Sequence, residues 1–355
     1  MRIVIAKNVL ESMLTHLQPF LEKRDNALIT SHIFIQTQQN SLQLRATDHE
    51  IGLSIASEFV KIQEPGALTA NGKKLLDIIK ILKEDEITLE LIGDMLHVKQ
   101  KTAKFKLPTF DANEYPTFVS VQGKAKIELD STQLIRSLKK ITPAIDNNNP
   151  KFELNGALID IKKESMNLVA TDTRRLAVVS IQRQNEKELA LIIPKKAIVE
   201  IQKLFVENIE IYYDETYLII QTAHYQFFTK LINGKFPDYQ RIIPTQAKHT
   251  LTLQKAPMVE AIKLITTVSN DIKVTFYSDR VVFQSLSDDN NDAQTEWIFD
   301  TGLTAPFILA INSRYILDFF GQIDSSDFFM KLNESNQPFV VEADTLKTII
   351  MPIVI

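Results

Sequence analysis

A cycle of predicted secondary structure that occurs three times is the feature that most restricts how this chain can fold. The cycle runs strand, helix, several strands, helix and strands, and its opening strands lie near residues 3, 127 and 250. These openings are 124 and 123 residues apart, whereas solenoid units repeat every ~20–50 residues. The sequence therefore predicts an α+β fold of three tandem, similar domains, each an antiparallel β-sheet plus two α-helices. The expected domains are residues 1–120, 126–244 and 245–355.

Short sequence motifs recur with the same spacing as the predicted secondary-structure elements. Within Ala170–Val178, one strand ends at the corner Thr171-Asp172 and a second strand begins. The same corner stands at Thr47-Asp48, which is 124 residues earlier. Unrelated α+β domains could share an order of elements by coincidence, but the repeated corner favours true repetition.

Each cycle contains two amphipathic helices whose polar faces carry lysine or arginine. The predicted helices span residues 7–24, 73–83, 131–141, 195–205, 256–268 and 313–321. A basic helix face is usually only a solvated surface, but here it recurs in a chain whose net charge is -4. This pattern predicts one basic surface and an acidic remainder. Few aromatic residues interleave with the basic ones, so diffuse contact with phosphates fits better than stacking on single-stranded bases.

The composition excludes several classes of protein and site. The chain has no cysteine, so disulfides, thiolate metal sites and cysteine nucleophiles are excluded, and a reducing cytoplasm is compatible. The apolar runs are far shorter than the ~20 residues of a membrane span, and residues 1–7 resemble a first strand rather than a signal peptide. The nine glycines form no phosphate-binding loop, and the six histidines lack metal-ligand spacing.

Asp48 and Asp172 are the carboxylates that could be catalytic. A Thr-Asp pair at a strand end more often closes a turn through side chain–backbone hydrogen bonds. A hydrolase or metal enzyme built on these two residues therefore remains the weaker hypothesis. The sequence predicts a protein that is not an enzyme, with no catalytic residues, no bound metal and no cofactor.

Four sequence words, taken together with the triple period, resemble one family. They are Ala170–Val178, Gly234–Pro244, Leu154–Gly156 and the terminal Met351-Pro352. Over its whole length the chain resembles the bacterial sliding clamp, the β subunit of the replicative DNA polymerase III holoenzyme. The resemblance implies the DNA clamp fold, in which two chains pair head to tail into a six-domain ring with helices lining the hole.

The resemblance also implies a function in DNA replication. The homodimeric ring would encircle duplex DNA without reading its sequence and tether the polymerase, which confers processivity. Lysine and arginine on inward helices suit such a tether, because phosphate contacts carry no sequence information. The implied partners are the polymerase III α subunit, the clamp loader and other replication and repair proteins, which bind through short linear peptides. The implied location is cytoplasmic, with no membrane association.

The family's peptide pocket lies between its second and third domains. Carried over by motif, its walls are expected at Leu154, Thr171, Thr173, Arg174, Arg175, Leu176, Pro237, Arg241, Ile242, Asn312, Tyr315, Ile349, Met351, Pro352 and Ile353. The alternative is that Leu176, Ile242 and Met351 are ordinary core residues. A protein-binding repeat scaffold that does not touch DNA also remains open.

DNA contacts and the dimer interface are expected on separate elements. The expected DNA contacts are Arg24, Lys73, Lys74, Arg136, Lys139, Lys140, Lys195 and Lys196. The resemblance implies a dimer interface at Phe105, Leu107, Thr267 and Val268.

The chain departs from the family pattern in three places. Thr173-Arg174 replaces the usual Gly-His, which adds bulk and charge at the pocket rim. Ile353–Ile355 ends the chain where a basic residue before a final leucine is common, so the peptide preference is open. Asp146–Pro150 lacks the typical glutamine of a loop that faces DNA.

Overall fold

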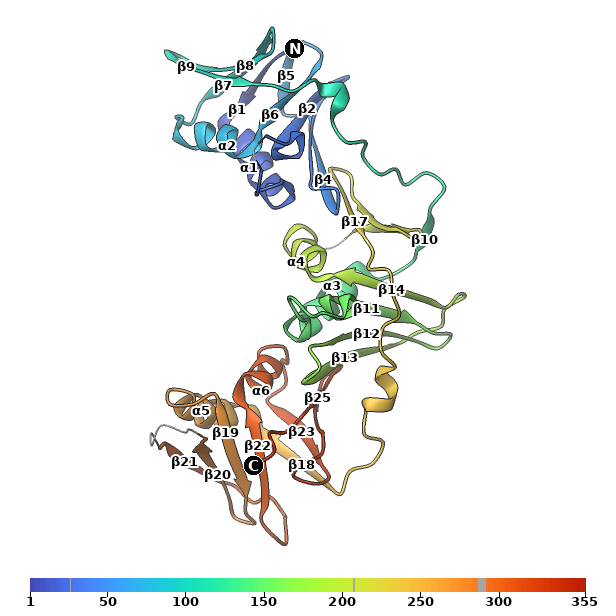
Figure 1. The fold of residues 1–355 in the computed structure, drawn as a ribbon, viewed down its shortest axis with the longest axis vertical. Coiled ribbons are helices and arrows are strands. Elements are labelled where there is room, and N and C mark those ends of the chain that lie inside the picture. The colour runs from blue at the N-terminus through green and yellow to red at the C-terminus, as the bar shows by residue number, and fades with distance from the viewer. Residues whose placement is uncertain (26, 207, 287–291) are drawn as a thin grey trace. The chain divides into compact units, whose positions relative to one another are not determined.

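The computed structural model describes residues 1–25, 27–206, 208–286 and 292–355 (Figure 1). The chain divides into two compact units, which are described separately below. Unit 1 contains Met1–Thr132 and Glu200–Leu231, and unit 2 contains Gln133–Val199 and Ile232–Ile355. Residues 126–244 thus contribute to both units, and the expected domain limits stay a prediction.

Unit 1 holds two sheets in which every strand pairing is antiparallel. The first, in the order β5-β1-β7-β8-β9, contains β1 (Arg2–Ala6), β5 (Val60–Glu64), β7 (Glu86–Ile92), β8 (Met95–Gln100) and β9 (Ala103–Pro108). The second, in the order β10-β15-β16-β17-β4-β3-β2-β6, contains β2 (His32–Gln38), β3 (Ser41–Thr47), β4 (Ile51–Ser57), β6 (Ala67–Asn71), β10 (Ala125–Ile127), β15 (Glu210–Tyr213), β16 (Tyr217–Gln221) and β17 (Tyr225–Lys230).

Unit 2 is built in the same way. Its larger sheet, in the order β14-β11-β12-β13-β25-β24-β23-β18, contains β11 (Gly156–Ile161), β12 (Ser165–Thr171), β13 (Arg175–Gln182), β14 (Leu189–Pro194), β18 (His249–Gln254), β23 (Asp327–Leu332), β24 (Phe339–Ala343) and β25 (Leu346–Ile350). Its smaller sheet, in the order β21-β20-β19-β22, contains β19 (Asp271–Phe276), β20 (Arg280–Ser285), β21 (Gln294–Ile298) and β22 (Phe307–Asn312).

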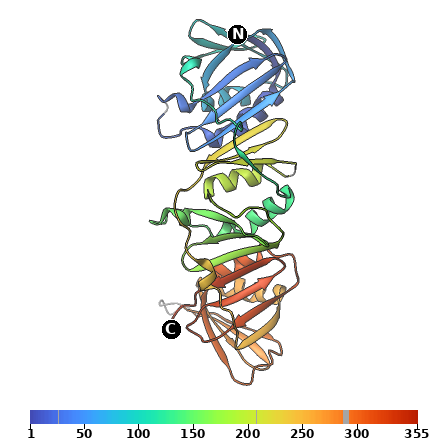
Figure 2. The same cartoon turned by 90° about the vertical axis from the view of Figure 1, so that its right-hand side faces the viewer.

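The described residues form six α-helices, which bury apolar stripes against these sheets. They are α1 (Lys7–Leu17), α2 (Gly72–Ile81), α3 (Ser131–Ile141), α4 (Lys195–Leu204), α5 (Lys255–Ile265) and α6 (Ser313–Phe320). In α6, Phe319 and Phe320 pack on Phe328 of β23, with ring centroids 6.0 and 4.9 Å apart. Figure 2 turns the strands of unit 2 toward the viewer, with α6 behind them.

The predicted helices are found in place, but the first is shorter than expected. The apolar stripe continues past Leu17, yet α1 ends there and a 3-10 turn, η1 (Gln18–Phe20), follows. Pro19 has no N–H to donate to an α-helical carbonyl, so the α-helix cannot continue through it. The prediction of a helix to residue 24 was wrong for this reason.

In each unit, a strand joint, which is a pairing between strands of two successive cycles, connects the cycles. In unit 1, β4 pairs with β17 from Ile51↔Thr229 to Ile55↔Tyr225. In unit 2, β13 pairs with β25 from Arg175↔Ile350 to Val179↔Leu346. In both joints, the strand after a Thr-Asp corner pairs with the last strand of the next cycle. The expected repetition is therefore confirmed at the level of strand register.

Two edge strands hold the positions that would form a third joint. β21 follows β20 as β13 follows β12, and β9 ends its cycle as β17 and β25 end theirs. Within the described residues, β9 and β21 each pair on one side only. Both therefore present unpaired backbone groups to another strand.

Candidate functional site

The second Thr-Asp corner closes its own turn. The Thr171 hydroxyl donates to the Arg175 carbonyl at 2.6 Å and accepts from the Thr173 N–H at 3.1 Å. Asp172 Oδ1 accepts from the N–H groups of Arg174 and Arg175, both at 3.0 Å. The side chains of the corner therefore satisfy the backbone between β12 and β13.

The first corner repeats this network. The Thr47 hydroxyl donates to the Ile51 carbonyl at 2.8 Å, and Asp48 Oδ1 accepts from the Ile51 N–H at 2.9 Å. His49 and Thr173 occupy the same left-handed position, with φ of 72° and 75°. A β-branched residue at positive φ is strained, which makes Thr173 a poor choice for this turn on local grounds. The corners are features of the fold, and this counts against the interpretation of Asp48 and Asp172 as catalytic.

Arg175 is the most heavily bonded side chain of the expected pocket, and it is buried. Its Nε donates to Asp172 Oδ2 at 3.0 Å, and its Nη1 donates to Asp318 Oδ2 at 2.7 Å. Its Nη2 donates to the Pro143 carbonyl, and its guanidinium carbon lies 4.7 Å from the centre of the Tyr315 ring. Arg175 therefore holds β13 against α6 and the turn after α3.

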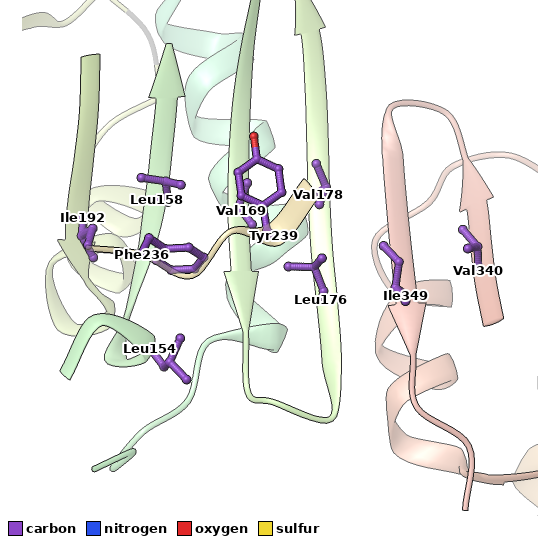
Figure 3. Packing of buried hydrophobic residues seen from close by; sticks show 10 residues of the cluster. All are labelled: Leu154, Leu158, Val169, Leu176, Val178, Ile192, Phe236, Tyr239, Val340 and Ile349. Carbon is purple, nitrogen blue, oxygen red and sulfur yellow. The ribbon is translucent and has the colours of Figure 1, made fainter. Parts of the chain in front are cut away.

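An apolar cluster lies on one face of the larger sheet of unit 2. Its ten buried residues are Leu154, Leu158, Val169, Leu176, Val178, Ile192, Phe236, Tyr239, Val340 and Ile349. Figure 3 shows Phe236 and Tyr239 crossing over β11 to β13, with Ile349 and Val340 on the neighbouring strands. The Tyr239 hydroxyl donates to Asp160 Oδ2 at 2.8 Å, and burial together with this carboxylate raises the pKa of Tyr239.

Sequence reasoning found part of this cluster and missed part. Leu154, Leu176 and Ile349 were expected as pocket walls, and each is 2% exposed within the cluster. The two aromatic side chains that cover the strands were missed. The signal was present, because Phe236 and Tyr239 both lie in Gly234–Pro244, a word used for the resemblance.

The other expected pocket residues surround the cluster at its surface. Ile242 is 45% exposed and Met351 is 38% exposed, so both present apolar surface to solvent. The Met351 N–H donates to the Arg174 carbonyl at 2.9 Å, so the C-terminal segment is tied to the corner. The exposed members of this rim are Thr173, Arg174, Pro237, Arg241, Ile242 and Met351.

Two expected residues near the rim have structural roles. Asn312 accepts from the Arg314 N–H at 3.2 Å and thereby caps α6, while its Nδ2 donates to Asp271 at 2.8 Å. The Ile353 N–H donates to the Ala310 carbonyl at 2.8 Å, which fastens the chain end to β22. Pro352 lies between these anchored residues and is half-buried. The C-terminal segment of the rim is therefore held in place by backbone bonds to Arg174 and to Ala310.

The basic residues expected at DNA differ in accessibility. Arg24, Lys73, Lys74, Arg136, Lys139 and Lys196 are exposed. Lys140 donates to the Thr345 hydroxyl at 3.3 Å. Lys195 donates to the Ile145 carbonyl at 2.7 Å, and burial lowers the pKa of its ammonium group. These last two lysines are partly engaged within the protein.

The residues expected at the dimer interface lie on two elements. Phe105 and Leu107 belong to the edge strand β9, where Leu107 is 6% exposed. Thr267 and Val268 follow the end of α5 in a turn, and Val268 is 38% exposed. Only β9 presents an open sheet edge at these positions.

The described part of the chain contains no group of three or more His, Asp or Glu residues placed to hold a metal ion. No described helix is long and apolar enough to cross a membrane.

Three family models match the chain in sequence. The DNA polymerase III beta subunit models match with the N-terminal domain at residues 1–119, the central domain at 128–238 and the C-terminal domain at 240–354. Among relatives, a beta sliding clamp of Helicobacter pylori is 36% identical over 351 residues, which is 96% of this chain and 94% of the relative. One of Pseudomonas putida is 26% identical over 365 residues, 99% of each.

Solved structures of similar proteins cover the whole chain. The Helicobacter pylori beta clamp, crystallised with a DNA ligase peptide, superposes with a TM-score of 0.94 at 36% identity over 100% of both chains. The DNA polymerase III subunit beta of Pseudomonas aeruginosa gives a TM-score of 0.92 at 25% identity, also over 100% of both.

Proposed function

This chain belongs to the family of DNA polymerase III beta subunits, the sliding clamps of DNA replication, and from this premise we propose how its residues perform that function. A sliding clamp holds the polymerase on DNA without catalysing the reaction. We infer that this chain has no catalytic activity and that it works in the cytoplasm. The carboxylates of Asp48 and Asp172 support the first inference, because both accept backbone hydrogen bonds within their own turns.

The observation that carries the ring is the pair of open edges at equivalent positions. A second copy that places its β9 on β21 would repeat the joints β4–β17 and β13–β25. Two such contacts would close a head-to-tail ring of six domains and cover the open edges of β9 and β21. Lys104 and Lys106 of β9 and Glu296 of β21 carry opposite charges, which favours this pairing over β9 with β9.

Duplex DNA would pass through the ring against the basic helices. Exposed Lys73 and Lys74 lie at the start of α2, and exposed Arg136 and Lys139 lie on α3. Contacts of these side chains with phosphates are independent of sequence and weaken with salt, which allows the clamp to slide. Lys195 would contribute less than Lys196, because it is half-buried and bonded to a carbonyl.

Partner proteins would bind at the apolar cluster and its rim through short peptides. The cluster is covered by Phe236 and Tyr239, while Ile242 and Met351 expose apolar surface beside it. An apolar peptide residue buried between them would contribute ~1.5–3 kcal/mol. Arg174, in place of the histidine common in the family, adds a positive charge to this rim, so acidic residues near the anchor would favour binding here. The complex of the Helicobacter pylori relative with a DNA ligase peptide supports binding of partners through short peptides.

The ring is tested by mass and by topology together. Light scattering after chromatography should give twice the 40.5 kDa of one chain at micromolar concentration. Once loaded, the protein should stay on closed circular DNA and leave when the circle is cut. A monomeric mass with equal retention on linear and circular DNA would overturn the proposal.

A further inference from the structure

Unit 1 contains a cavity at the position that corresponds to the apolar cluster of unit 2. Its volume is about 500 Å³, and its walls include Phe34, Arg45, Tyr115, Phe118, Ser120 and Gln226. Gln226 of β17, a strand of the joint β4–β17, lies in its wall, as the joint β13–β25 contributes Leu176, Val178 and Ile349 to the cluster. A cavity of this size is within the range that holds small organic ligands.

The correspondence is residue by residue. In unit 1, Arg45 pairs with Phe34 on one neighbouring strand and with Ser54 on the other. In unit 2, Val169 pairs in the same way with Leu158 and with Val178. Each position in unit 2 is 124 residues after its counterpart, as Tyr239 is after Tyr115. An arginine and a serine thus stand where the cluster has two valines. The chemistry of the two sites is therefore different although their backbone frame is shared.

The charge of Arg45 lacks a counterion within the described part of the chain. Its Nη2 donates to Gln43 Oε1 at 2.5 Å, while its Nε is buried without a hydrogen-bond acceptor. Its guanidinium carbon lies 5.6 Å from the centre of the Phe34 ring and 5.7 Å from that of Phe118. No carboxylate of the described residues forms an ion pair with it, and burial lowers the pKa of its guanidinium.

Tyr115 does not supply the missing negative charge. Its hydroxyl donates to the carbonyls of His32 and Arg45, at 3.1 and 3.3 Å, and burial raises its pKa, so the phenol stays neutral. A partly desolvated cation without an anion carries a desolvation free-energy cost, and an anionic ligand in the cavity would offset this cost.

We propose that this cavity is a binding site for an organic carboxylate whose apolar part packs on the rings of Phe34 and Phe118. The planar guanidinium presents N–H groups in the geometry that a carboxylate accepts. Among the described residues that line the cavity, Arg45 alone is charged, which suits a ligand with one negative charge better than a phosphate. The inference depends only on unit 1, so it stands or fails independently of ring formation and of the peptide site.

The test is a titration of the full-length protein with benzoate, and with benzamide as its neutral counterpart. Benzoate should bind more tightly than benzamide, and Arg45→Met should weaken benzoate by roughly tenfold or more. Arg280→Met is the matched control. Arg280 also lies over a ring, 4.9 Å from the centre of Tyr277, but it already pairs with Asp279 at 3.1 Å. This control should leave benzoate affinity unchanged.

Two further variants locate the ligand. Phe118→Ala keeps the charge and removes one ring, so it should weaken benzoate less than Arg45→Met does. Deleting Met351–Ile355 removes part of the peptide site and should leave benzoate affinity unchanged. Hydrogen exchange of β3 confirms that each variant is folded. Equal affinity for benzoate and benzamide would overturn the proposal. Unchanged benzoate affinity in both Arg45→Met and Phe118→Ala would also overturn it, as would weaker benzoate binding after deletion of Met351–Ile355.

A capped dipeptide of aspartate and phenylalanine distinguishes the source of the carboxylate. Binding of the dipeptide with the same dependence on Arg45 assigns the site to acidic peptide segments. Benzoate binding without dipeptide binding assigns it to free small carboxylates. Both results support a carboxylate site, whereas binding of neither compound refutes it.

Discussion

The hydroxyl of Tyr239 offers a sensitive test of how the cover over the apolar cluster is held. Tyr239 is 6% exposed and donates to Asp160, whose residue exposure is 5%. A hydrogen bond to a charged acceptor contributes ~1.5–3 kcal/mol. Lys162 lies 3.2 Å from the other oxygen of Asp160, so the carboxylate keeps one partner when the hydroxyl is removed. Tyr239→Phe should therefore destabilise unit 2 by about 2 kcal/mol.

The repeat provides the matched control. Tyr115 stands at the corresponding position of unit 1, is 8% exposed, and donates to two neutral carbonyls at 3.1 and 3.3 Å. Hydrogen bonds between neutral groups contribute less to stability, so Tyr115→Phe should destabilise unit 1 by about 1 kcal/mol. The two changes remove the same atom from similar burial, and they differ in the charge of the acceptor.

Native-state hydrogen exchange measures each effect in its own unit, since a chain of this size need not unfold in one step. The amides of β11 and β12 report on Tyr239→Phe, and those of β2 and β3 report on Tyr115→Phe. If Tyr115→Phe lowers the opening free energy of its unit as much as Tyr239→Phe does, or more, then the charge of the acceptor is not the decisive factor.

Four further outcomes are expected. Thr173→Gly relieves ~1–2 kcal/mol of left-handed strain and loses ~0.5–1 kcal/mol through a more flexible unfolded chain, so exchange in β12 should slow slightly; faster exchange would contradict the strain argument. Leu176→Asp should abolish binding of a polymerase-derived peptide while light scattering still gives a dimer; unchanged peptide affinity would refute the site. Reversing the charges of Lys73 and Arg136 to Glu should reduce loading onto circular DNA and polymerase processivity and leave peptide affinity intact, whereas unchanged loading and processivity would refute the role of these two residues at DNA. Burial lowers the pKa of His32 to about 4, so folding loses stability as pH falls from the unfolded value near 6.5 toward 4; exchange in β2 should show a loss of about 1–2 kcal/mol at pH 5, absent in His32→Gln.

Local patterns predicted the helices well where the local signal was complete. The stripe of Leu134, Ile135 and Leu138 predicted a helix over residues 131–141, which are the bounds of α3 in the structure. The same kind of stripe overran α1, because apolar spacing continues past Leu17 while Pro19 removes a backbone donor. Periodicity reports which face is apolar, and it does not report where the hydrogen-bond ladder breaks.

The candidate site was only partly predictable because its residues come from distant parts of the chain. Val169 and Val340 lie in the same cluster although 171 residues separate them. Arg175 was expected as a pocket wall, and its side chain also bonds Asp318, which lies 143 residues further along the chain. The sequence of the corner alone could not distinguish an arginine that faces solvent from one that faces a carboxylate on α6.

The sequence by itself determined the number of repeats, their period of about 124 residues, the two helices in each and the corners at Asp48 and Asp172. These features depend on residue spacing and on neighbours in the chain, so local sequence patterns are enough to predict them. Only the tertiary structure decided what surrounds the equivalent positions 45 and 169: a charge without a counterion among the described residues at Arg45, and a packed apolar cluster around Val169. The reason is physical: whether a side chain is buried, paired or exposed is set by strands and helices that approach it from elsewhere in the chain.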